Sequence, residues 1–140
     1  SLPRYEDIAP TVHIALRCER RLLDKRINER ARAMFDGGLV EEVEALIDQG
    51  IREGETAPRA IGYAQALAVI DGTMSVPEAV DSTALATRQL ASRQIKWFRR
   101  DPRLHWIDVA LTEAGQCTDS ERSRLTRQAW ELVCARRGVA

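Results

Sequence analysis

Apolar residues recur at three- and four-residue spacing in the first half of the chain, the pattern of helices with one buried face. Residues 19–35 carry the first repeat, formed by Leu23, Ile27, Ala31 and Met34. Gly37 and Gly38 follow it and favour a helix end. Residues 39–49 carry a second, acidic repeat, formed by Val43, Leu46 and Ile47. Together the two segments predict a helical hairpin.

Two further helices are predicted along the chain. Residues 56–71 begin with Thr56, Ala57 and Pro58, and proline suits a first helical turn, so a third helix is expected to continue to Asp71. Ser75 has a glutamate, Glu78, three residues later, which is the spacing of a capping box. A fourth helix is therefore expected from Ser75 to about Arg99, before Asp101 and Pro102.

The remaining segments predict strands at 11–16 and 105–109 and a last amphipathic helix. Thr118 or Asp119 can cap that helix, which is expected to end before Gly138. Residues 1–10 contain two prolines and indicate a linker. The expected fold is mainly α with one or two short strands.

Composition narrows the class of protein. With 44% hydrophobic and 30% charged residues, the sequence is typical of a soluble, folded domain. It contains no apolar run near the roughly 20 residues of a membrane helix and no signal-peptide pattern, so a cytoplasmic location is expected. Three cysteines at wide spacing, Cys18, Cys117 and Cys134, are expected to be free thiols.

The net charge of zero hides strongly unlike segments. Residues 17–32 contain seven Arg or Lys and three acids, and residues 88–103 contain six Arg or Lys and one acid. Residues 36–55 contain seven acids and one Arg. Such segregated charge creates local fields that the sum conceals.

The fourth predicted helix contains the run ATRQLASRQIKWFRR, residues 86–100. Arg88, Ser92, Lys96 and Arg99 follow the three- and four-residue spacing that aligns side chains on one face, and three of the four are cations. Guanidinium groups bind phosphates bidentately, so this face suits nucleic acid. The alternative is a solvated face whose cations pair with the acidic second helix.

Several other side chains have both a functional and a structural interpretation. Trp97 and Phe98 could stack on bases, although the pattern favours core positions for them and for Trp106 and Trp130. Arg26 and Arg30 could bind a diphosphate or RNA, or pair with Asp24 or Glu29. Gly62 inside a helix would be explained by close approach of another helix or of RNA.

Other chemistries are not indicated. His13 and His105 have no acid or cysteine at metal-ligand spacing, and no nucleophile and base occur together. The phosphate-loop pattern GxxxxGK[ST] does not occur.

Three segments in order, residues 26–30, residues 59–65 and the run at 86–100, resemble the C-terminal part of the tRNA dimethylallyltransferases, also called isopentenyl-tRNA transferases. The similarity covers roughly residues 11–108 and includes Met34, residues 38–43 and residues 105–108. It implies the C-terminal part of an α/β P-loop transferase fold, with residues 11–109 in the transferase core and residues 110–140 as a helical tail.

The resemblance implies transfer of a dimethylallyl group from dimethylallyl diphosphate to the N6 amine of the adenosine 3′ of the anticodon. The expected partners are the tRNA anticodon stem-loop and the diphosphate donor, with Mg²⁺ in the full-length enzyme and no cofactor in this chain. The phosphate loop and general-base aspartate of such enzymes lie near the N-terminus and are absent here. We therefore expect this chain alone to be inactive.

The resemblance also implies roles for particular residues. Arg30 corresponds to an arginine near the reaction centre, and residues 52–57 and 87–92 to RNA-contacting segments. Ser92 replaces a usual lysine, and Ala64 a usual larger polar residue. The expected tRNA-binding residues are Arg59, Tyr63, Thr87, Arg88, Gln89, Ser92, Arg93, Gln94, Lys96 and Arg99.

Two alternatives stay open. The chain could be a non-catalytic helical module that binds RNA or protein without preference for an anticodon stem-loop. It could also be a structural fragment that self-associates, with the strand at 11–16 as an exposed edge.

Overall fold

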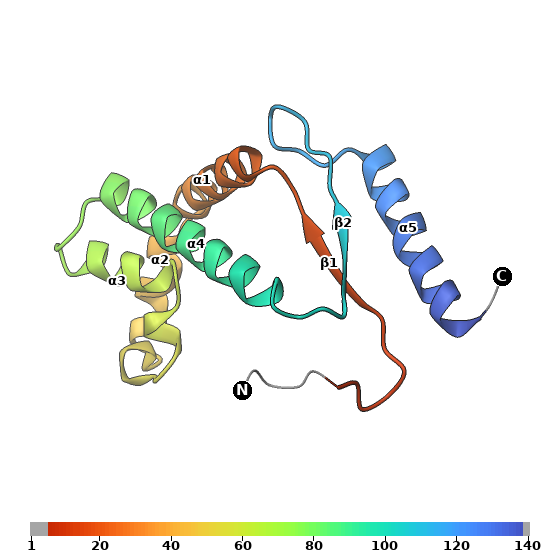
Figure 1. Ribbon diagram of the computed structural model, residues 1–140. Helices are drawn as coiled ribbons and strands as arrows, with labels where there is room; N and C mark the ends of the chain where they lie inside the picture. The colour runs from red at the N-terminus through yellow and green to blue at the C-terminus, as the bar shows by residue number, and fades with distance from the viewer. Residues whose placement is uncertain (1–5, 139–140) are drawn as a thin grey trace. The chain divides into compact units, whose positions relative to one another are not determined.

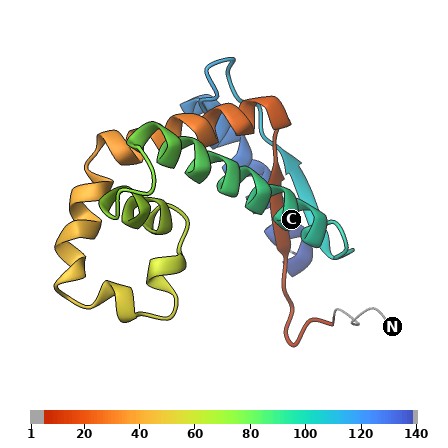
Figure 2. The same ribbon diagram turned by 90° about the vertical axis from the view of Figure 1, so that its left-hand side faces the viewer.

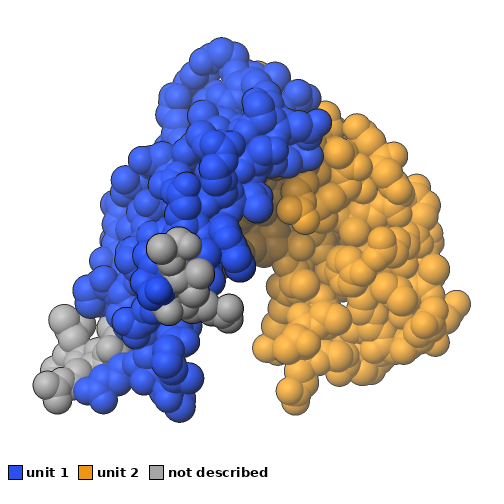
Figure 3. Space-filling model, turned by 90° about the vertical axis from the view of Figure 1, so that its right-hand side faces the viewer, with its two compact units in different colours: residues 1–23, 93–140 blue, residues 24–92 orange. Residues whose placement is uncertain are grey.

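The computed structural model describes residues 6–138, so the expected linker at 1–10 lies partly outside the described residues. The chain divides into two compact units, coloured in Figure 3. Unit 2 is the continuous segment Asp24–Ser92, and unit 1 combines Ser1–Leu23 with Arg93–Ala140. Helices predominate, with two short strands, so the expected mainly α fold is confirmed.

Unit 2 contains the helical hairpin that the apolar repeats predict. Helix α1 spans Arg20–Asp36, of which residues from Asp24 onward belong to this unit, and helix α2 spans Leu39–Ile47. Between the two helices, Gly38 adopts a φ of 96°. The core of the unit consists of buried residues from several helices, namely Phe35, Leu39, Val43, Ala66, Leu67 and Ala79.

The expected continuous third helix at 56–71 is wrong. Two short 3₁₀ turns, η1 at Ile51–Glu53 and η2 at Ala57–Arg59, precede a helix α3 that covers only Tyr63–Ile70. The break lies at Gly62, whose φ of 98° is incompatible with a right-handed helix.

Gly62 is explained by packing within the unit. A Cβ at this position would lie 3.1 Å from Met34 Cε and 3.6 Å from Leu39 Cδ2. The Gly62 N–H donates to Gln65 Oε1 at 2.8 Å, which closes the first turn of α3. Of the two explanations for a glycine here, the structure provides the close approach of neighbouring helices.

Helix α4 spans Val76–Phe98, and its start matches the predicted capping box. The Ser75 N–H donates to Glu78 Oε2 at 2.8 Å, and the Glu78 N–H donates to Ser75 Oγ at 3.3 Å. Figures 1 and 2 both show α4 beside α1 within unit 2. On the buried side of α4, the Thr83 side chain is 2% exposed, and its hydroxyl has no hydrogen-bond partner among residues 6–138.

Unit 1 contains a parallel pair of strands, β1 at His13–Arg17 and β2 at Leu104–Asp108. Both lie where the sequence predicts strands, and each is the other's partner. His13 is opposite Leu104, and Arg17 is opposite Asp108. Arg17 Nε donates to Asp108 Oδ1 at 2.5 Å, and its guanidinium lies 5.9 Å from the centre of the Trp106 ring.

Helix α5, Asp119–Arg137, is attached to the end of β2 by polar contacts. Thr118 caps it as predicted, with its hydroxyl accepting from the Glu121 N–H at 3.2 Å. The Glu121 side chain is buried, accepts the Ala110 N–H at 2.8 Å and pairs with Arg124 at 2.6 Å. These hydrogen bonds hold the pKa of Glu121 at about 2, with Arg124 the largest cause.

The expected core position of Trp130 is wrong. Its side chain is 61% exposed, because it lies on the side of α5 opposite to Glu121 and Leu125. Trp106 is half-buried. The cysteines Cys18, Cys117 and Cys134 are free thiols, as expected.

Candidate nucleic-acid interface

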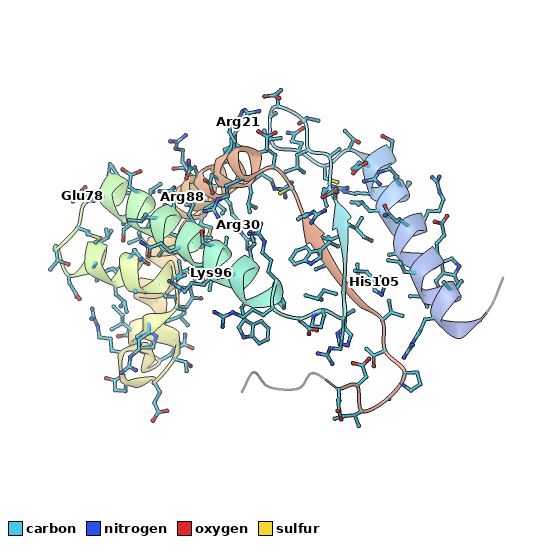
Figure 4. All side chains as sticks on the ribbon, viewed as in Figure 1. Arg21, Arg30, Glu78, Arg88, Lys96 and His105 are labelled. Carbon is cyan, nitrogen blue, oxygen red and sulfur yellow. The ribbon has the colours of Figure 1, made fainter. Side chains whose placement is uncertain are left out.

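The exposed surface of the second half of α4 combines amides and cations. Gln89, Arg93 and Lys96 are exposed and follow one another at spacings of four and three residues, so they lie in one row along the helix. Arg99 and Arg100, also exposed, come directly after the helix end at Phe98. Figure 4 labels Lys96 on this part of α4. The row is an extended set of donors suited to a phosphate backbone.

These cations are not neutralised locally. Within unit 1, none of the described residues forms an ion pair with Arg93, Lys96, Arg99 or Arg100. The nearby acid Asp101 instead pairs with Arg103, at 2.7 Å, and this hydrogen-bonded pair lowers the pKa of Asp101 to about 2. The positive charge at the end of α4 is thus available to an anionic partner.

Two aromatic side chains lie among the cations. Trp97 is 59% exposed and Phe98 is 39% exposed, so the interpretation of both as core residues is wrong. Their rings contact each other edge to face, with centres 5.1 Å apart. The helix end has no covering element in its own unit, among the residues described, that would bury them. An exposed aromatic pair flanked by cations can stack on unpaired bases.

Arg88 differs from the cations that follow it. It is half-buried, and its Nη1 donates to the side-chain carbonyl of Asn28 on α1. The neighbouring hydroxyls donate to the backbone of their own helix, Thr87 Oγ1 to Thr83 O at 2.8 Å and Ser92 Oγ to Arg88 O at 3.1 Å. The Arg88 side chain is thus held by a residue of a second helix, and its backbone carbonyl accepts from Ser92.

Arg30, the expected catalytic residue, lies on α1 and is exposed (Figure 4). Across the part of the chain that the structure describes, its side chain has no hydrogen bond or ion pair. Arg30 and Asn28 are two residues apart on the helix, about 200° around its axis, so their side chains leave in different directions. Among the described residues, no hydrogen-bonded residue links Arg30 to Arg88.

The other expected RNA-binding residues lie in the segment from η1 to the start of α3. Arg59, in η2, is exposed. Arg52 forms a two-armed ion pair with Asp71, at 2.7 and 3.2 Å, which lowers the pKa of that carboxyl. Tyr63 is half-buried and its hydroxyl donates to Glu42, which raises the pKa of the phenol. These contacts fix the segment to α2 and to the end of α3.

Gln94 is exposed on α4, about 100–160° around the helix axis from Gln89, Arg93 and Lys96, so it lies outside their row. The structure therefore distributes the expected tRNA-binding residues over an exposed row, exposed positions of α4 outside that row, a half-buried group at Thr87 and Arg88, and the segment from η2 to the start of α3. Arg100 and Asn28 were not among the predicted site residues. Arg100 lies within the basic run, but nothing in the sequence pairs Asn28 with a residue 60 positions away.

Residues 6–138 contain no group of three or more His, Cys, Asp or Glu that could hold a metal ion. The His13 Nε2–H donates to Asp7 Oδ1 at 2.9 Å, and His105 is exposed on β2 (Figure 4). In the described part of the chain, no helix has the length and apolarity required to cross a bilayer.

Comparison with known proteins decides the family. A family model described as IPP transferase matches residues 3–101. The chain belongs to the IPP transferase family. A tRNA dimethylallyltransferase of Pseudarthrobacter chlorophenolicus is 50% identical over 122 residues, which are 84% of this chain and 41% of the relative. The enzyme of that name from Mycobacterium tuberculosis is 44% identical over 133 residues, covering 93% of this chain and 40% of the relative.

A solved IPP transferase supports the same assignment. The crystal structure of the full-length tRNA isopentenylpyrophosphate transferase from Bacillus halodurans aligns with a TM-score of 0.76 at 29% identity. That alignment covers 94% of this chain and 42% of the other. The chain thus spans about two fifths of the length of these IPP transferase relatives.

Proposed function

We propose that this chain is the C-terminal part of a tRNA dimethylallyltransferase and supplies RNA-binding and scaffold helices. The proposal rests on the composition of the end of α4. There, exposed cations flank two exposed aromatic rings and have no acid partner among the described residues of their own unit. Family membership indicates that the RNA bound by this surface is tRNA, because the relatives are named tRNA dimethylallyltransferases.

The reaction forms a bond between the adenosine N6 and the first carbon of dimethylallyl diphosphate. The carbon–oxygen bond to diphosphate breaks, and N6 loses a proton. The chain has no GxxxxGK[ST] phosphate loop in its sequence, so binding of the leaving diphosphate falls to a part of the enzyme outside this chain. The cytoplasm, where tRNA is modified, is the proposed location.

In this proposal, the row of Gln89, Arg93 and Lys96 binds the RNA backbone. Trp97 and Phe98 stack on bases of the anticodon loop. Arg59, Tyr63, Gln94 and Arg99 remain proposed tRNA contacts. Arg30 is proposed to act near the transferred group, because it is exposed and without a partner among the residues described. Residues 110–140, beyond the matched family segment, form the proposed helical tail.

The test is binding of the purified chain to an anticodon stem-loop with adenosine 3′ of the anticodon, and to a scrambled hairpin, at two salt concentrations. Preferential, salt-sensitive binding is expected. Arg93→Gln combined with Lys96→Gln should reduce the logarithmic salt slope by about 1.5, since each phosphate contact contributes about 0.7–0.9. Arg122→Gln, which removes an exposed cation from α5, is the matched control.

A different outcome would select another function. Equal binding of both RNAs would favour a helical RNA-binding module without anticodon preference. No binding to either RNA would contradict the proposed role of α4. Prenyl transfer by the chain alone should be undetectable, and measurable turnover would overturn the assignment of the diphosphate site to another part of the enzyme.

A further inference from the structure

We propose that Asn28 is a positioning residue that orients the Arg88 guanidinium for RNA. This inference rests on the proposed function and adds a residue that was not among the expected contacts. It begins from the hydrogen bond in which Arg88 Nη1 donates to the Asn28 side-chain carbonyl, across 60 residues of sequence. Both residues belong to unit 2, and both Figures 1 and 2 show their helices side by side.

The chemistry of the pair suits orientation. A guanidinium has five N–H donors in a fixed plane, and an amide carbonyl that holds one nitrogen also fixes that plane. An amide carries no charge, so it restrains Arg88 without neutralising it. A carboxylate at this position would compete directly with a phosphate for the same cation.

The location of Arg88 makes such restraint useful. Its half-buried side chain begins the segment that continues through the exposed Gln89 and Arg93 toward Lys96. Arginine side chains have high rotamer entropy, which is lost when they bind a phosphate. A side chain that is already fixed in its bound orientation loses less rotamer entropy on binding. The free energy of binding is more favourable by that difference.

The role of Asn28 can be tested by substitution. Asn28 is exposed, so its removal creates no cavity in the core. Asn28→Ala keeps the charge of Arg88 and removes the hydrogen bond that Asn28 accepts from it. We expect it to weaken binding of the anticodon stem-loop about three- to tenfold, the range that follows from ordering one long side chain.

A double-mutant cycle separates positioning from other effects. Arg88→Gln alone should weaken binding, and adding Asn28→Ala to it should have no further effect, because the group to be oriented is gone. Asn28→Asp keeps an oxygen acceptor but adds a carboxylate that competes with phosphate for Arg88, so it should bind RNA no more tightly than Asn28→Ala. Gln49→Ala is the matched control, since this exposed amide of unit 2 donates only to Ala45 O, at 3.4 Å, on its own helix.

Urea unfolding of each variant would show that the fold is retained. If Asn28→Ala binds RNA as tightly as the parent while Arg88→Gln binds more weakly, the positioning role is overturned and the proposed function stands. If the two substitutions together weaken binding by the product of their separate effects, Asn28 acts independently of Arg88, and the proposal also fails. A parent chain that binds no RNA would overturn the proposed function and, with it, this inference.

Discussion

The two units differ in both charge and cohesion. Unit 1 contains fourteen Lys or Arg and nine Asp or Glu, a net charge of +5, and unit 2 contains seven and twelve, a net charge of −5. Among residues 6–138, nine of the eleven buried hydrophobic residues belong to unit 2, and the other two, Leu22 and Ile107, belong to unit 1. The chain therefore combines two unlike units. The basic unit is held together largely by polar contacts, and the acidic unit is held together by an apolar core.

The difference in charge between the two units matters for the proposed binding of RNA. RNA is attracted by the net positive unit and repelled by the acidic one, so long-range electrostatics can orient the approach of the anticodon stem-loop. Short-range contacts then act on α4, which contributes residues to both units. We also expect the two units to respond differently to mutation and to pH.

The largest effect is expected from Phe35→Ala, in the core of unit 2. Phe35 is 6% exposed, and truncation of a buried phenylalanine costs about 3–5 kcal/mol through lost transfer energy and a cavity. The measurement is the free energy of unfolding in urea, followed by circular dichroism. Leu85→Ala, at a position that is 50% exposed, should cost about 0.5 kcal/mol or less. Similar losses for both would contradict an apolar core centred on Phe35.

Gly62→Ala should be the next most destabilising, by about 1–3 kcal/mol, since alanine is strained at a φ of 98°. Its Cβ would also meet Met34 Cε at 3.1 Å. Gly72→Ala is the matched control, because Gly72 has a φ of 72° but no atom within 4 Å of the added Cβ. The difference between the two unfolding free energies measures the Met34 contact together with the greater backbone strain at Gly62, and a zero difference would contradict both.

Glu121→Gln tests the polar attachment of α5 in unit 1. The folded pKa of about 2 lies below the ordinary value of 4.5, so the carboxylate stabilises the fold above pH 4.5. That stability is lost as the pH falls from 4.5 through 2. Glu121→Gln should flatten the pH dependence in this window, although Asp101, with a pKa of about 2, retains part of it.

The tryptophans make this experiment specific to one unit, because all three, Trp97, Trp106 and Trp130, lie in unit 1. Their fluorescence during urea unfolding at pH 7, 4 and 2.5 would report the basic unit. Glu131→Gln, at an exposed position on the same helix, is the matched control. An unchanged profile for Glu121→Gln would refute the role of this carboxylate.

Thr83→Val is expected to have the smallest effect, and of opposite sign. The threonine hydroxyl is buried without a partner among residues 6–138, and an unmatched polar group is costly. Valine has nearly the same shape, so the acidic unit should gain up to about 1 kcal/mol in its unfolding free energy. A loss of comparable size would mean that the hydroxyl has a hydrogen-bond partner in solution.

Local signals in the sequence predicted most of the helices and both strands. The capping box at Ser75 and Glu78, the cap at Thr118 and the apolar repeat from Leu23 act over a few residues, and each gave an element close to its observed bounds. The third helix was predicted wrongly because the conformation of Gly62 depends on Met34 and Leu39, which approach it only in the folded unit.

The site was less accessible to prediction for the same reason. The basic run identified α4, but periodicity alone could not show that Arg88 is held by Asn28 while Lys96 is exposed. Nor could it show that Trp97 and Phe98 are exposed, since an amphipathic pattern does not reveal whether a covering element exists. Pairings such as Glu121 with the Ala110 N–H require the tertiary fold.

The parallel pairing of β1 with β2 also constrains the order of folding. Arg17 and Asp108, at the end of the pair, are 91 residues apart in sequence, so the strands must close a very long loop before they gain any contact. Unit 2 is continuous and lies entirely inside that loop. Its earlier folding would shorten the free chain that separates the strands. We therefore expect the helical segment to form first, with strand pairing as the late and slower step of folding.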